Sequence, residues 1–528
     1  MRRFIFILFL LFTCSIYSNV YNGLIIYSNS QGVGSSNTYL MNNNYLYINT
    51  WDHLGGVIGI PHLNTDRSII VQSRSQDHSF GNSHGPVGGI FEKLDWDGNI
   101  LWSYRFYSDY FHPHHDFEVL PNGNILILAW EKKSLQEAQN YGRINIINEM
   151  WPLMIAEVQP VVPDSGIIVW EWHLWDHLIQ DVDSSLPNYG VVSDHPELVD
   201  INIGNFTNPN GGDWLHSNAI AYNQQLEQIV FSSRHFDEIF IIDHSTTTEE
   251  AASHQGGNSN KGGDILYRWG NPINYGRGTI DNQMLNAQHG VHWIHSQMPG
   301  GENLIIYNNN PTDTSGQDNT VGNSSVVEIT PPINSEGNYD IAPDSAFGPN
   351  NYDWEYGGDS TFFSHFQSGA YRLQNGNTFV TVSQEKYIFE IDTMGNIVWD
   401  YNFEDIQGHS GNTARAKKYE LNYLDTEVGD LTSDHLINVY DLVAVIELII
   451  EGQYDEKADQ NSDGEVDNVD LDILAGLIRL ICFQIYRSAY YRAFQISCLF
   501  PGILLYYLFA VSSPSANEPH SLCQVCWA

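Results

Sequence analysis

Histidines recur at four points along the chain, and each point lies at the start of a segment whose residues predict a β-strand. A neutral imidazole can act as a nucleophile, a general base or a metal ligand, and the spacing alone leaves these roles open. A single histidine is more often structural than functional, but recurrence at one structural position favours a shared role. The histidines concerned are His112, His114, His115, His216, His289, His292 and His365.

A cation follows the second of these histidine clusters. Arg234 lies in the polar segment 232–235, and the planar fork of a guanidinium group matches the oxygens of an oxyanion. The alternative is a salt bridge to one of the many carboxylates of this chain. The sequence therefore offers Arg234 as a candidate anion-binding residue.

These side chains must be positioned by a repeated β-unit. One part of the repeat is a hairpin around Asn-Gly, at 114–128 and again at 370–380, since Asn-Gly supplies the positive φ values of a two-residue turn. The other part alternates apolar and acidic residues, turns, and ends on aromatic residues, as at 90–104 and 388–401. Looser copies of this second part end at 169–172, 266–269 and 353–356. The chain thus contains five recognisable units.

A sixth unit is predicted between residues 37 and 51, where Trp51 closes a short alternating segment. Units of four short strands with periodic aromatic residues predict an all-β, six-bladed β-propeller. A β-sandwich is the alternative for an all-β chain of this size, but it would not predict the recurring hairpin and Trp. Because the innermost strands of a propeller line its axis, the four histidine clusters are expected to converge in one funnel.

The composition is strongly acidic. With 63 Asp and Glu against 22 Lys and Arg, the formal net charge is −41, which argues against nucleic acid or an anionic membrane as partners held by bulk electrostatics. Two Arg, an apolar run over 4–12 and small or polar residues up to 18 predict a signal peptide at 1–18. We therefore expect a secreted or periplasmic protein, with attachment to the cell surface as one option, and no membrane span in the main domain at 19–420.

Two short acidic loops within residues 428–481 each lead into an apolar helix. Their oxygen-bearing side chains follow the rhythm of an EF-hand loop, which wraps a calcium ion. A solvated acidic linker is the alternative. The predicted calcium ligands are Asp430, Thr432, Asp434, Asn438 and Asp441 in the first loop and Asp459, Asn461, Asp463, Asp467 and Asp470 in the second.

This pair of loops resembles a dockerin module. The resemblance implies a small α-helical calcium-binding module at 428–481, which attaches a secreted domain to a cohesin-type protein; a sorting or anchoring tail is the alternative. Residues 482–528 then lose acidity and gain four of the five cysteines. We interpret them as an anomalous tail, consistent with a shifted reading frame, and assign them no function.

The main domain resembles the bacterial arylsulfotransferase family from about residue 55 to 419. The motifs that carry the resemblance, in order, are Trp-x-His-x-Asn at 214–218, Ser-Ser-Arg-His at 232–235, Tyr-Arg-Trp-Gly at 267–270, Gln-His at 288–289 and Asn-Gly-Asn-Thr at 375–378. The resemblance implies a six-bladed propeller that moves a sulfuryl group from a phenolic sulfate donor to a phenol acceptor. It implies a transient sulfohistidine and neither a nucleotide sulfate donor nor a dissociable cofactor.

Residue by residue, His216 and His289 match family histidines that bind or polarise the sulfate. The family's arginine after Gln-His has no counterpart here, so the cation that holds the sulfate is either missing or supplied by Arg234. The family's sulfate-accepting histidine is replaced by the segment 383–386, and His365 is the nearest alternative. We predict catalytic roles for His216, His289, His365 and Arg234, and substrate binding by His115, His292 and Asn218.

Two other functions stay open at this point. One is a catalytically silent propeller that binds glycan or protein ligands, which the missing arginine and the displaced histidine favour. The other is a polysaccharide-active lyase or hydrolase in the same funnel, which the dockerin-like module favours. A structure that brings His216, His289 and His365 together would count against the silent propeller.

Overall fold

The computed structural model divides the chain into two compact units, Met1–Leu421 and Asn422–Ala528. The predicted signal peptide and the anomalous tail lie outside the part of the chain that the structure describes. The described residues are 20–29, 36–75, 80, 86–204, 212–311, 322–335, 337–359, 361–403, 412–424, 431, 439–455, 457–461, 465–476 and 478.

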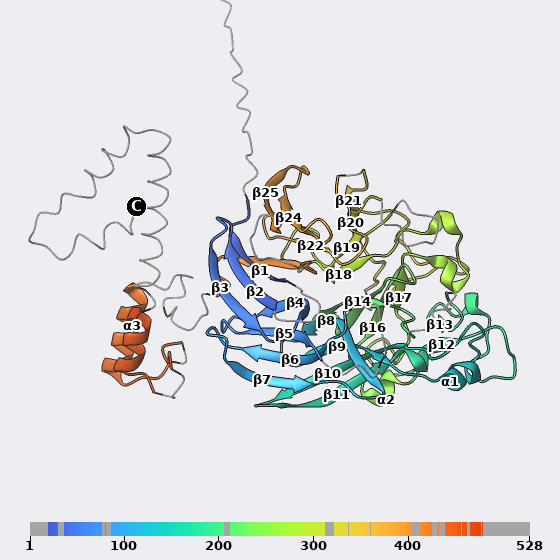
Figure 1. The fold of residues 1–528 in the computed structure, drawn as a ribbon, viewed down its shortest axis with the longest axis horizontal. Helices are drawn as coiled ribbons and strands as arrows, with labels where there is room; N and C mark the ends of the chain where they lie inside the picture. The colour runs from blue at the N-terminus through green and yellow to red at the C-terminus, as the bar shows by residue number, and fades with distance from the viewer. Residues whose placement is uncertain are drawn as a thin grey trace, which may run out of the picture. The chain divides into compact units, whose positions relative to one another are not determined.

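Six four-stranded antiparallel sheets follow one another around the centre of the first unit (Figure 1). In five of the six neighbouring pairs of sheets the innermost strands pack against each other, and the outermost strands lie at the periphery. The predicted all-β, six-bladed propeller is confirmed. The blades account for all six predicted units, including the one between 37 and 51, which lies in β2 (Ser36–Asn42) and β3 (Tyr47–His53).

The strands run from the innermost to the outermost position as follows. The six blades are β26 (Ala416–Glu420), β1 (Gly23–Asn29), β2 (Ser36–Asn42), β3 (Tyr47–His53); β4 (Val57–Leu63), β5 (Ile69–Arg74), β6 (Gly89–Leu94), β7 (Ile100–Arg105); β8 (Phe111–Val119), β9 (Ile125–Glu131), β10 (Leu153–Val161), β11 (Ser165–His173); β14 (Ser217–Asn223), β15 (Gln228–Ser233), β16 (Glu238–Asp243), β17 (Tyr267–Trp269); β18 (His289–Trp293), β19 (Leu304–Asn308), β20 (Ser325–Ile329), β21 (Trp354–Gly357); and β22 (Gly369–Arg372), β23 (Thr378–Val382), β24 (Tyr387–Ile391), β25 (Ile397–Asn402).

The hairpin turns differ from the two-residue turn that Asn-Gly predicts. Between β8 and β9, Leu120 and Asn124 close a three-residue loop through an N–H to O bond of 2.8 Å, and Gly123 alone has a positive φ, +82°. Pro121 favours the negative φ of an ordinary type I turn, so only the glycine that follows adopts the left-handed conformation. The predicted hairpin is confirmed, but the predicted two-residue turn is wrong, because the loop has three residues.

Strand β26 closes the ring by pairing with β1, with Glu420 opposite Gly23. Lys418 on β26 forms a fully buried ion pair with Glu390 on β24, at 2.6 Å. The same carboxylate accepts the backbone N–H of Tyr21 at 2.7 Å. Both ends of the propeller chain are therefore tied to the blade that precedes the closure.

Tryptophans of the outermost strands join each blade to the next. In five of the six blades the indole Nε1 donates to a backbone carbonyl of the following blade, and in the remaining blade Arg372 lies over the Trp354 ring at 4.7 Å. This explains why the repeat ends on Trp, because the indole combines a large apolar area with one donor. The five donors and their acceptors are Trp51 to Asp95, Trp102 to Ser165, Trp172 to Gly263, Trp269 to Pro349 and Trp399 to Asn43, at 2.7 to 2.9 Å.

Replacing Trp102 by phenylalanine is expected to lower the free energy of unfolding by about 1–3 kcal/mol, because the ring area is largely kept and the Ser165 carbonyl loses its donor. Urea unfolding followed by fluorescence measures the change. Trp96→Phe is the matched control. Its ring packs edge-on against Trp51, and its indole N–H has no acceptor among the described residues. Equal effects of the two substitutions would contradict the bridging role.

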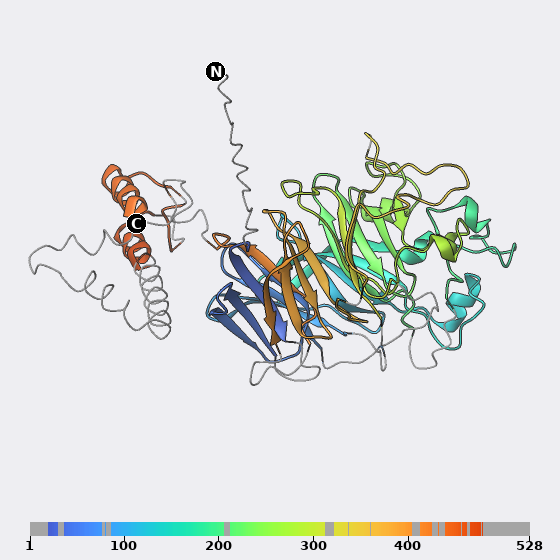
Figure 2. The same ribbon diagram turned by 90° about the horizontal axis from the view of Figure 1, so that it is seen from above.

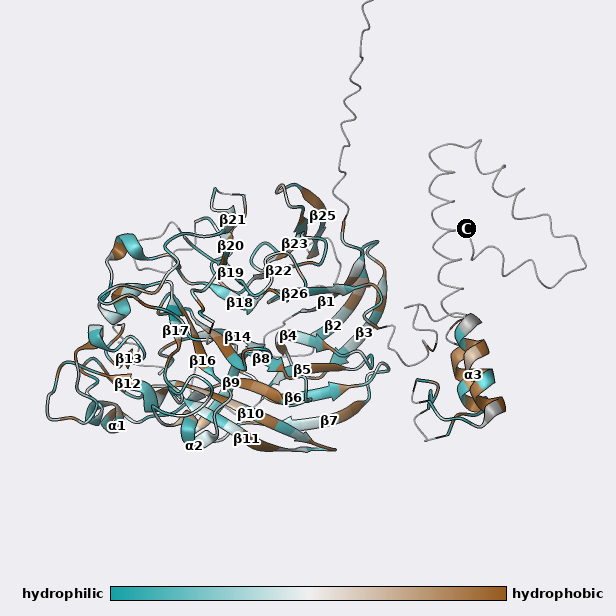
Figure 3. Cartoon of the chain, turned by 180° about the vertical axis from the view of Figure 1, so that it is seen from behind, coloured by the Kyte–Doolittle hydropathy of each residue, from teal (hydrophilic) through white to brown (hydrophobic). Residues whose placement is uncertain are grey.

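Insertions between strands add short helices and a small parallel pair. In both ribbon views α1, β12 and β13 lie on the side of the propeller away from β1–β3 (Figures 1 and 2). Figure 3 shows that hydrophobic residues concentrate on the strands and hydrophilic residues on the connecting loops. The inserted elements are α1 (Leu135–Asn140), η1 (Leu174–His177), β12 (Leu178–Ile179), η2 (Val192–Asp194), β13 (Val199–Asp200), α2 (Thr248–Ala251), η3 (Pro272–Tyr275) and η4 (Ile280–Asn282).

The second unit contains helix α3 (Val439–Glu451) and a helical stretch over 468–476. Val445, Ala458 and Leu474 form its small buried core. Of the predicted calcium ligands, Asp430, Thr432, Asp434, Asn438 and Asp463 lie outside the described residues. No helix in the described part of the chain is both long and apolar enough to cross a membrane.

Candidate functional site

Four innermost strands are irregular at corresponding points. The register shifts within all four strands, where two extra residues in β4 and β8 and one extra residue in β14 and β18 interrupt the pairing with the next strand. Such bulges re-aim side chains and are frequent beside active sites. Three of the four bulges coincide with predicted histidine clusters, at 112–115, 216–218 and 289–292.

Two of these histidines have an uncommon backbone conformation. His115 has a φ of +55° and His216 a φ of +52°. A left-handed residue other than glycine costs on the order of 1–3 kcal/mol and persists where the surrounding structure fixes it, often at a functional site. Ala287, just before β18, and Gln367, just before β22, share this conformation with φ of +54° and +51°. In four blades a strained residue therefore lies within the innermost strand or one or two residues before it.

A carboxylate and three imidazoles form a continuous chain of hydrogen bonds. Asp213 Oδ2 lies 2.5 Å from His216 Nδ1, His216 Nε2 lies 3.1 Å from His115 Nε2, and His115 Nδ1 lies 2.8 Å from His114 Nδ1. The other carboxylate oxygen, Oδ1, accepts the indole N–H of Trp130 at 2.9 Å and the backbone N–H of His216 at 3.1 Å. The carboxylate is thus fixed in place by three donors.

The protonation states within this chain of hydrogen bonds follow from the burial of its side chains. Burial acts to raise the pKa of Asp213, but the charge and hydrogen bond of His216 outweigh it and hold that pKa well below its usual range. Burial lowers the pKa of His114 to about 3, and it lowers the pKa of His115 well below the usual range with help from the charge of His216. Asp213 is therefore ionised and accepts the N–H of His216, while His115 and His114 are neutral at pH 7.

His289 is held in one tautomer. Its Nδ1 lies 2.8 Å from Asn309 Oδ1 and 3.0 Å from the carbonyl oxygen of Ala287. Asn309 is oriented in turn, because its Nδ2 donates to the carbonyls of Ser364 and Gln367. Burial, followed by the charge of Arg234, lowers the pKa of His289 well below its usual range. His289 is therefore neutral with its hydrogen on Nδ1 and a lone pair on Nε2, which has no hydrogen-bond partner among the described residues.

Arg234 connects His289 to the last of the predicted histidines. Its guanidinium donates to the carbonyl oxygen of His365 at 3.4 Å, and its charge lowers the pKa of both His115 and His289. The His365 ring is fixed by Gln384, whose Oε1 lies 2.6 Å from His365 Nδ1. Gln384 belongs to the turn at 383–386, between β23 and β24.

Two predicted substrate-binding residues make other contacts. His292 Nδ1 faces the carbonyl of Gly290 at 3.2 Å, and the ring lies 4.5 Å from that of Tyr371. Asn218 Nδ2 donates to the carbonyl of Gln288 at 2.8 Å, which ties β14 to the start of β18. His115, by contrast, lies directly beside His216.

The structure thus brings His115, His216, His289, His365 and Arg234 into one linked group. Sequence reasoning missed the three residues that orient the imidazoles. Asp213 stands next to the Trp-x-His-x-Asn motif, so its proximity to His216 was a usable signal. Asn309 and Gln384 lie in other strands or turns than the histidines they hold, and no sequence signal points to them.

The neutral buried histidines predict acid sensitivity. The pKa of His114 in the folded protein is about 3, against about 6.5 in an unfolded chain. As the pH falls below about 6.5 the unfolded chain therefore binds a proton that the folded protein does not, and each such histidine lowers the free energy of unfolding by up to about 1.4 kcal/mol per pH unit. His114→Gln is expected to make the pH dependence of urea unfolding shallower. The control His195→Gln removes a half-exposed ring and should not; an unchanged slope for His114→Gln would contradict the neutral state.

Comparison with known proteins agrees with the motifs. The model of the arylsulfotransferase (ASST) family matches residues 19–388, which is more than half of the chain. The chain belongs to the arylsulfotransferase family. Membership in the arylsulfotransferases implies a transferase of the sulfotransferase type, with phenols and aryl sulfates as the substrate class. No curated protein matches the chain significantly.

Solved structures similar to this arylsulfotransferase family member are distant. A protein of unknown function from Bacteroides caccae is 11% identical with a TM-score of 0.39, and the match covers 75% of this chain and 98% of that one. A periplasmic gluconolactonase from Pseudomonas aeruginosa is 8% identical with a TM-score of 0.34, covering 75% and 98%. A catalytically inactive virginiamycin B lyase from Staphylococcus aureus is 10% identical with a TM-score of 0.33, covering 74% and 87%.

Proposed function

We propose that this protein is a secreted aryl-sulfate sulfotransferase that moves a sulfuryl group from a phenolic sulfate ester to a phenol through a histidine intermediate. The observation that carries the proposal is the state of His289. Two acceptors hold its Nδ1–H, so that Nε2 presents a lone pair beside the guanidinium of Arg234. A neutral imidazole next to a fixed cation suits attack on an anionic sulfate ester.

In the first half-reaction His289 Nε2 attacks the sulfur atom. The N–S bond forms as the bond between sulfur and the phenolic oxygen breaks, and the phenolate leaves with the electron pair. The positive charge that develops on the imidazole is stabilised by Asn309 Oδ1 and the Ala287 carbonyl, which already accept its Nδ1–H. Arg234 stabilises the sulfuryl oxygens through its donors.

The chain of hydrogen bonds from Asp213 to His114 donates a proton to the leaving phenolate and accepts one from the acceptor phenol. The Nε2 atoms of His115 and His216 face each other at 3.1 Å and share a hydrogen, so a phenolate oxygen placed beside them takes that proton. In the second half-reaction the acceptor phenol gives its proton to the same pair, and its oxygen attacks the sulfohistidine. The imidazole of His289 is released unchanged, so no dissociable cofactor takes part.

His365 is a second candidate for the nucleophile. Gln384 Oε1 faces its Nδ1, which again leaves the lone pair on Nε2. It differs from His289 in being partly exposed and in having one acceptor, not two, at Nδ1 among the described residues. His289 and His365 could each attack sulfur through Nε2, and the His289→Ala and His365→Ala variants distinguish the two.

A transfer assay tests the proposed function. The secreted chain is given a chromogenic aryl sulfate with and without a phenol acceptor, and release of the chromophore is followed. Release that depends on the acceptor is expected, together with appearance of the sulfated acceptor. Release without acceptor would indicate a hydrolase, and no release from folded protein would favour the silent ligand-binding propeller or a polysaccharide-active enzyme.

We also propose that the second unit binds calcium and serves as a dockerin-like attachment to a cohesin-type protein. Three predicted ligands, Asp441, Asp459 and Asp470, are buried in the described part of this unit. Asp470 accepts the backbone N–H groups of Gln460 and Asp467 at 2.8 Å each, so two described parts of the second loop contact one carboxylate. Carboxylates gathered in this way fit a hard cation.

Calcium removal is expected to unfold this second unit alone. Chelation should reduce helical circular dichroism by the contribution of α3 and leave the propeller's thermal unfolding in place, because the predicted ligands all lie beyond residue 428. Asp470→Ala should have the same effect without chelator, and Asp66→Ala on the β4–β5 turn serves as the control. Full helical signal in calcium-free Asp470→Ala would contradict calcium binding.

A further inference from the structure

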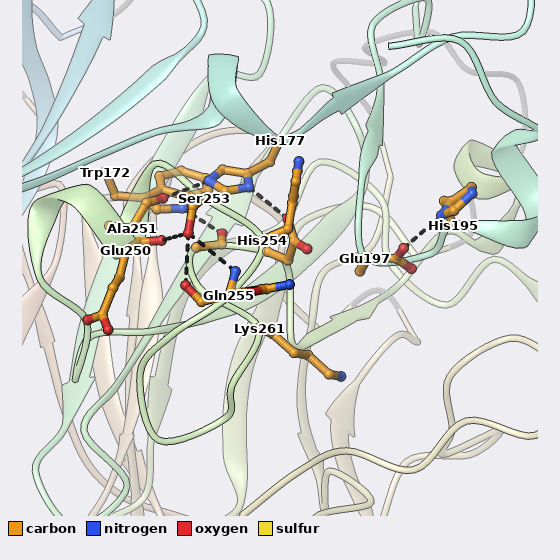
Figure 4. A network of polar contacts seen from close by, with 12 residues as sticks. Trp172, His177, His195, Glu197, Glu250, Ala251, Ser253, His254, Gln255 and Lys261 are labelled. Carbon is orange, nitrogen blue, oxygen red and sulfur yellow. Dashed lines mark hydrogen bonds and ion pairs between the residues drawn. The ribbon is translucent and has the colours of Figure 1, made fainter. Parts of the chain in front are cut away.

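His177, at the end of η1, has a fully buried side chain with both ring nitrogens facing acceptors (Figure 4). Its Nε2 lies 2.8 Å from the carbonyl oxygen of Ala251, and its Nδ1 lies 2.8 Å from Asp264 Oδ1. A neutral imidazole has one N–H, and a carbonyl can only accept. In the neutral ring Nε2 therefore carries the hydrogen, and the lone pair of Nδ1 points at a carboxylate.

The same carboxylate oxygen faces a second imidazole. His254 Nδ1 lies 2.7 Å from Asp264 Oδ1, and the three atoms that could bind a metal all lie within 4.8 Å of one another. The His254 side chain is 62% exposed, so the group is open to solvent on that side. Two imidazole nitrogens and one carboxylate oxygen form a ligand set that suits zinc and similar divalent transition metals.

The surroundings of His177 match those of a metal ligand. A ligating imidazole commonly donates its other N–H to a backbone carbonyl, as His177 does to Ala251. Its ring also stacks on Trp172, with centroids 5.6 Å apart and an interplanar angle of 5°. The ring is therefore oriented before any ion binds.

The loop that carries Asp264 is built to approach His177 closely. A side chain at Gly263 would place its Cβ 1.9 Å from the Ala251 carbonyl oxygen and 2.6 Å from His177 Nε2, so only glycine fits. The Gly263 carbonyl in turn accepts the indole N–H of Trp172 at 2.7 Å. The three residues thus come from two neighbouring blade insertions, η1 after β11 and the loop between α2 and β17.

We propose that His177, His254 and Asp264 bind one divalent transition-metal ion of the zinc class, with solvent completing the coordination. The ion joins the η1 insertion to the α2–β17 loop. The group shares no residue with the proposed sulfuryl-transfer site, so it is a separate site.

Cobalt binding tests the proposal, because Co²⁺ bound by nitrogen and oxygen at low coordination number absorbs strongly in the visible range. The untagged full chain is stripped with chelator, supplied with excess Ca²⁺ to occupy carboxylate loops, and titrated with Co²⁺. We expect a visible band that saturates at one equivalent and is displaced by Zn²⁺. His254→Ala should lose this band; because His254 is exposed, the variant should keep its fold.

Two control variants should keep the band. His195→Ala removes a half-exposed histidine that pairs with a single carboxylate, Glu197, at 2.8 Å, and His216→Ala removes a histidine of the central group. No band with folded wild-type protein, or an equal band in His254→Ala, would overturn the proposal and leave these three residues as an ion-pair network only. A band lost in His216→Ala would likewise overturn it, since cobalt would then be bound at the centre of the propeller.

Discussion

Replacing His289 by alanine is expected to lower kcat for acceptor-dependent sulfuryl transfer by roughly 10³-fold or more, because the variant lacks the nitrogen that forms the covalent intermediate. The imidazole is buried, and its Nδ1 is held by Asn309 Oδ1 and the Ala287 carbonyl. Its loss therefore removes the nucleophile and leaves the innermost strands paired. Steady-state kinetics with saturating phenol acceptor measures the effect.

His195→Ala is the matched control for this variant, because it removes a half-exposed histidine in a peripheral insertion. It should retain wild-type kcat. His365→Ala is expected to keep a measurable rate if His365 only supports Arg234 through its backbone carbonyl. A His289→Ala variant with nearly full activity, together with an inactive His365→Ala variant, would move the nucleophile to His365.

Replacing Asp213 by asparagine is expected to lower kcat by roughly 10²–10⁴-fold while the protein stays folded. The amide oxygen can keep both bonds of Oδ1, from Trp130 Nε1 and the His216 backbone N–H. The amide nitrogen then replaces Oδ2 and donates to His216 Nδ1, which forces the hydrogen of that ring to the other nitrogen. The chain of hydrogen bonds from residue 213 through His216 to His115 can then no longer transfer a proton in the same direction.

The pH profile separates this effect from a structural one. Because the variant changes a tautomer, we expect a changed pH dependence of kcat with a nearly unchanged thermal midpoint. Asp66→Asn, at an exposed turn where Asp66 pairs with Lys93, is the control and should change neither. An Asp213→Asn variant with wild-type kcat would show that the carboxylate does not act through His216.

The propeller could be predicted because the sequence patterns that mark its blades each lie within a short segment of the chain. A hairpin around Asn-Gly and a strand ending in Trp recur within short windows, and each such window gave one half of a blade. The closing strand β26 was not predicted, because Ala416–Glu420 pairs with β1 at the other end of the domain and its sequence carries no turn or Trp signal. Its pairing is decided by the closure of the ring.

The histidines of the central group could be predicted for the same local reason, since each lies within an innermost strand or a few residues before it. Their hydrogen-bond partners could not. Asn309 is the middle one of three consecutive asparagines, and only the bulge in β18, which shifts the register after His289 opposite Tyr307, determines which of the three faces the imidazole. Likewise Gln384, in the turn between β23 and β24, contacts His365, which lies before β22.

The most direct test of the account is to trap the intermediate. The protein is mixed with an aryl sulfate donor without acceptor, quenched at alkaline pH, where an N-sulfonated imidazole survives, and digested for mass spectrometry. We predict one sulfuryl group per chain, on the peptide that contains His289, and its loss when phenol is added before the quench. A sulfuryl group on another residue, or turnover with no modified peptide at any time, would contradict the account.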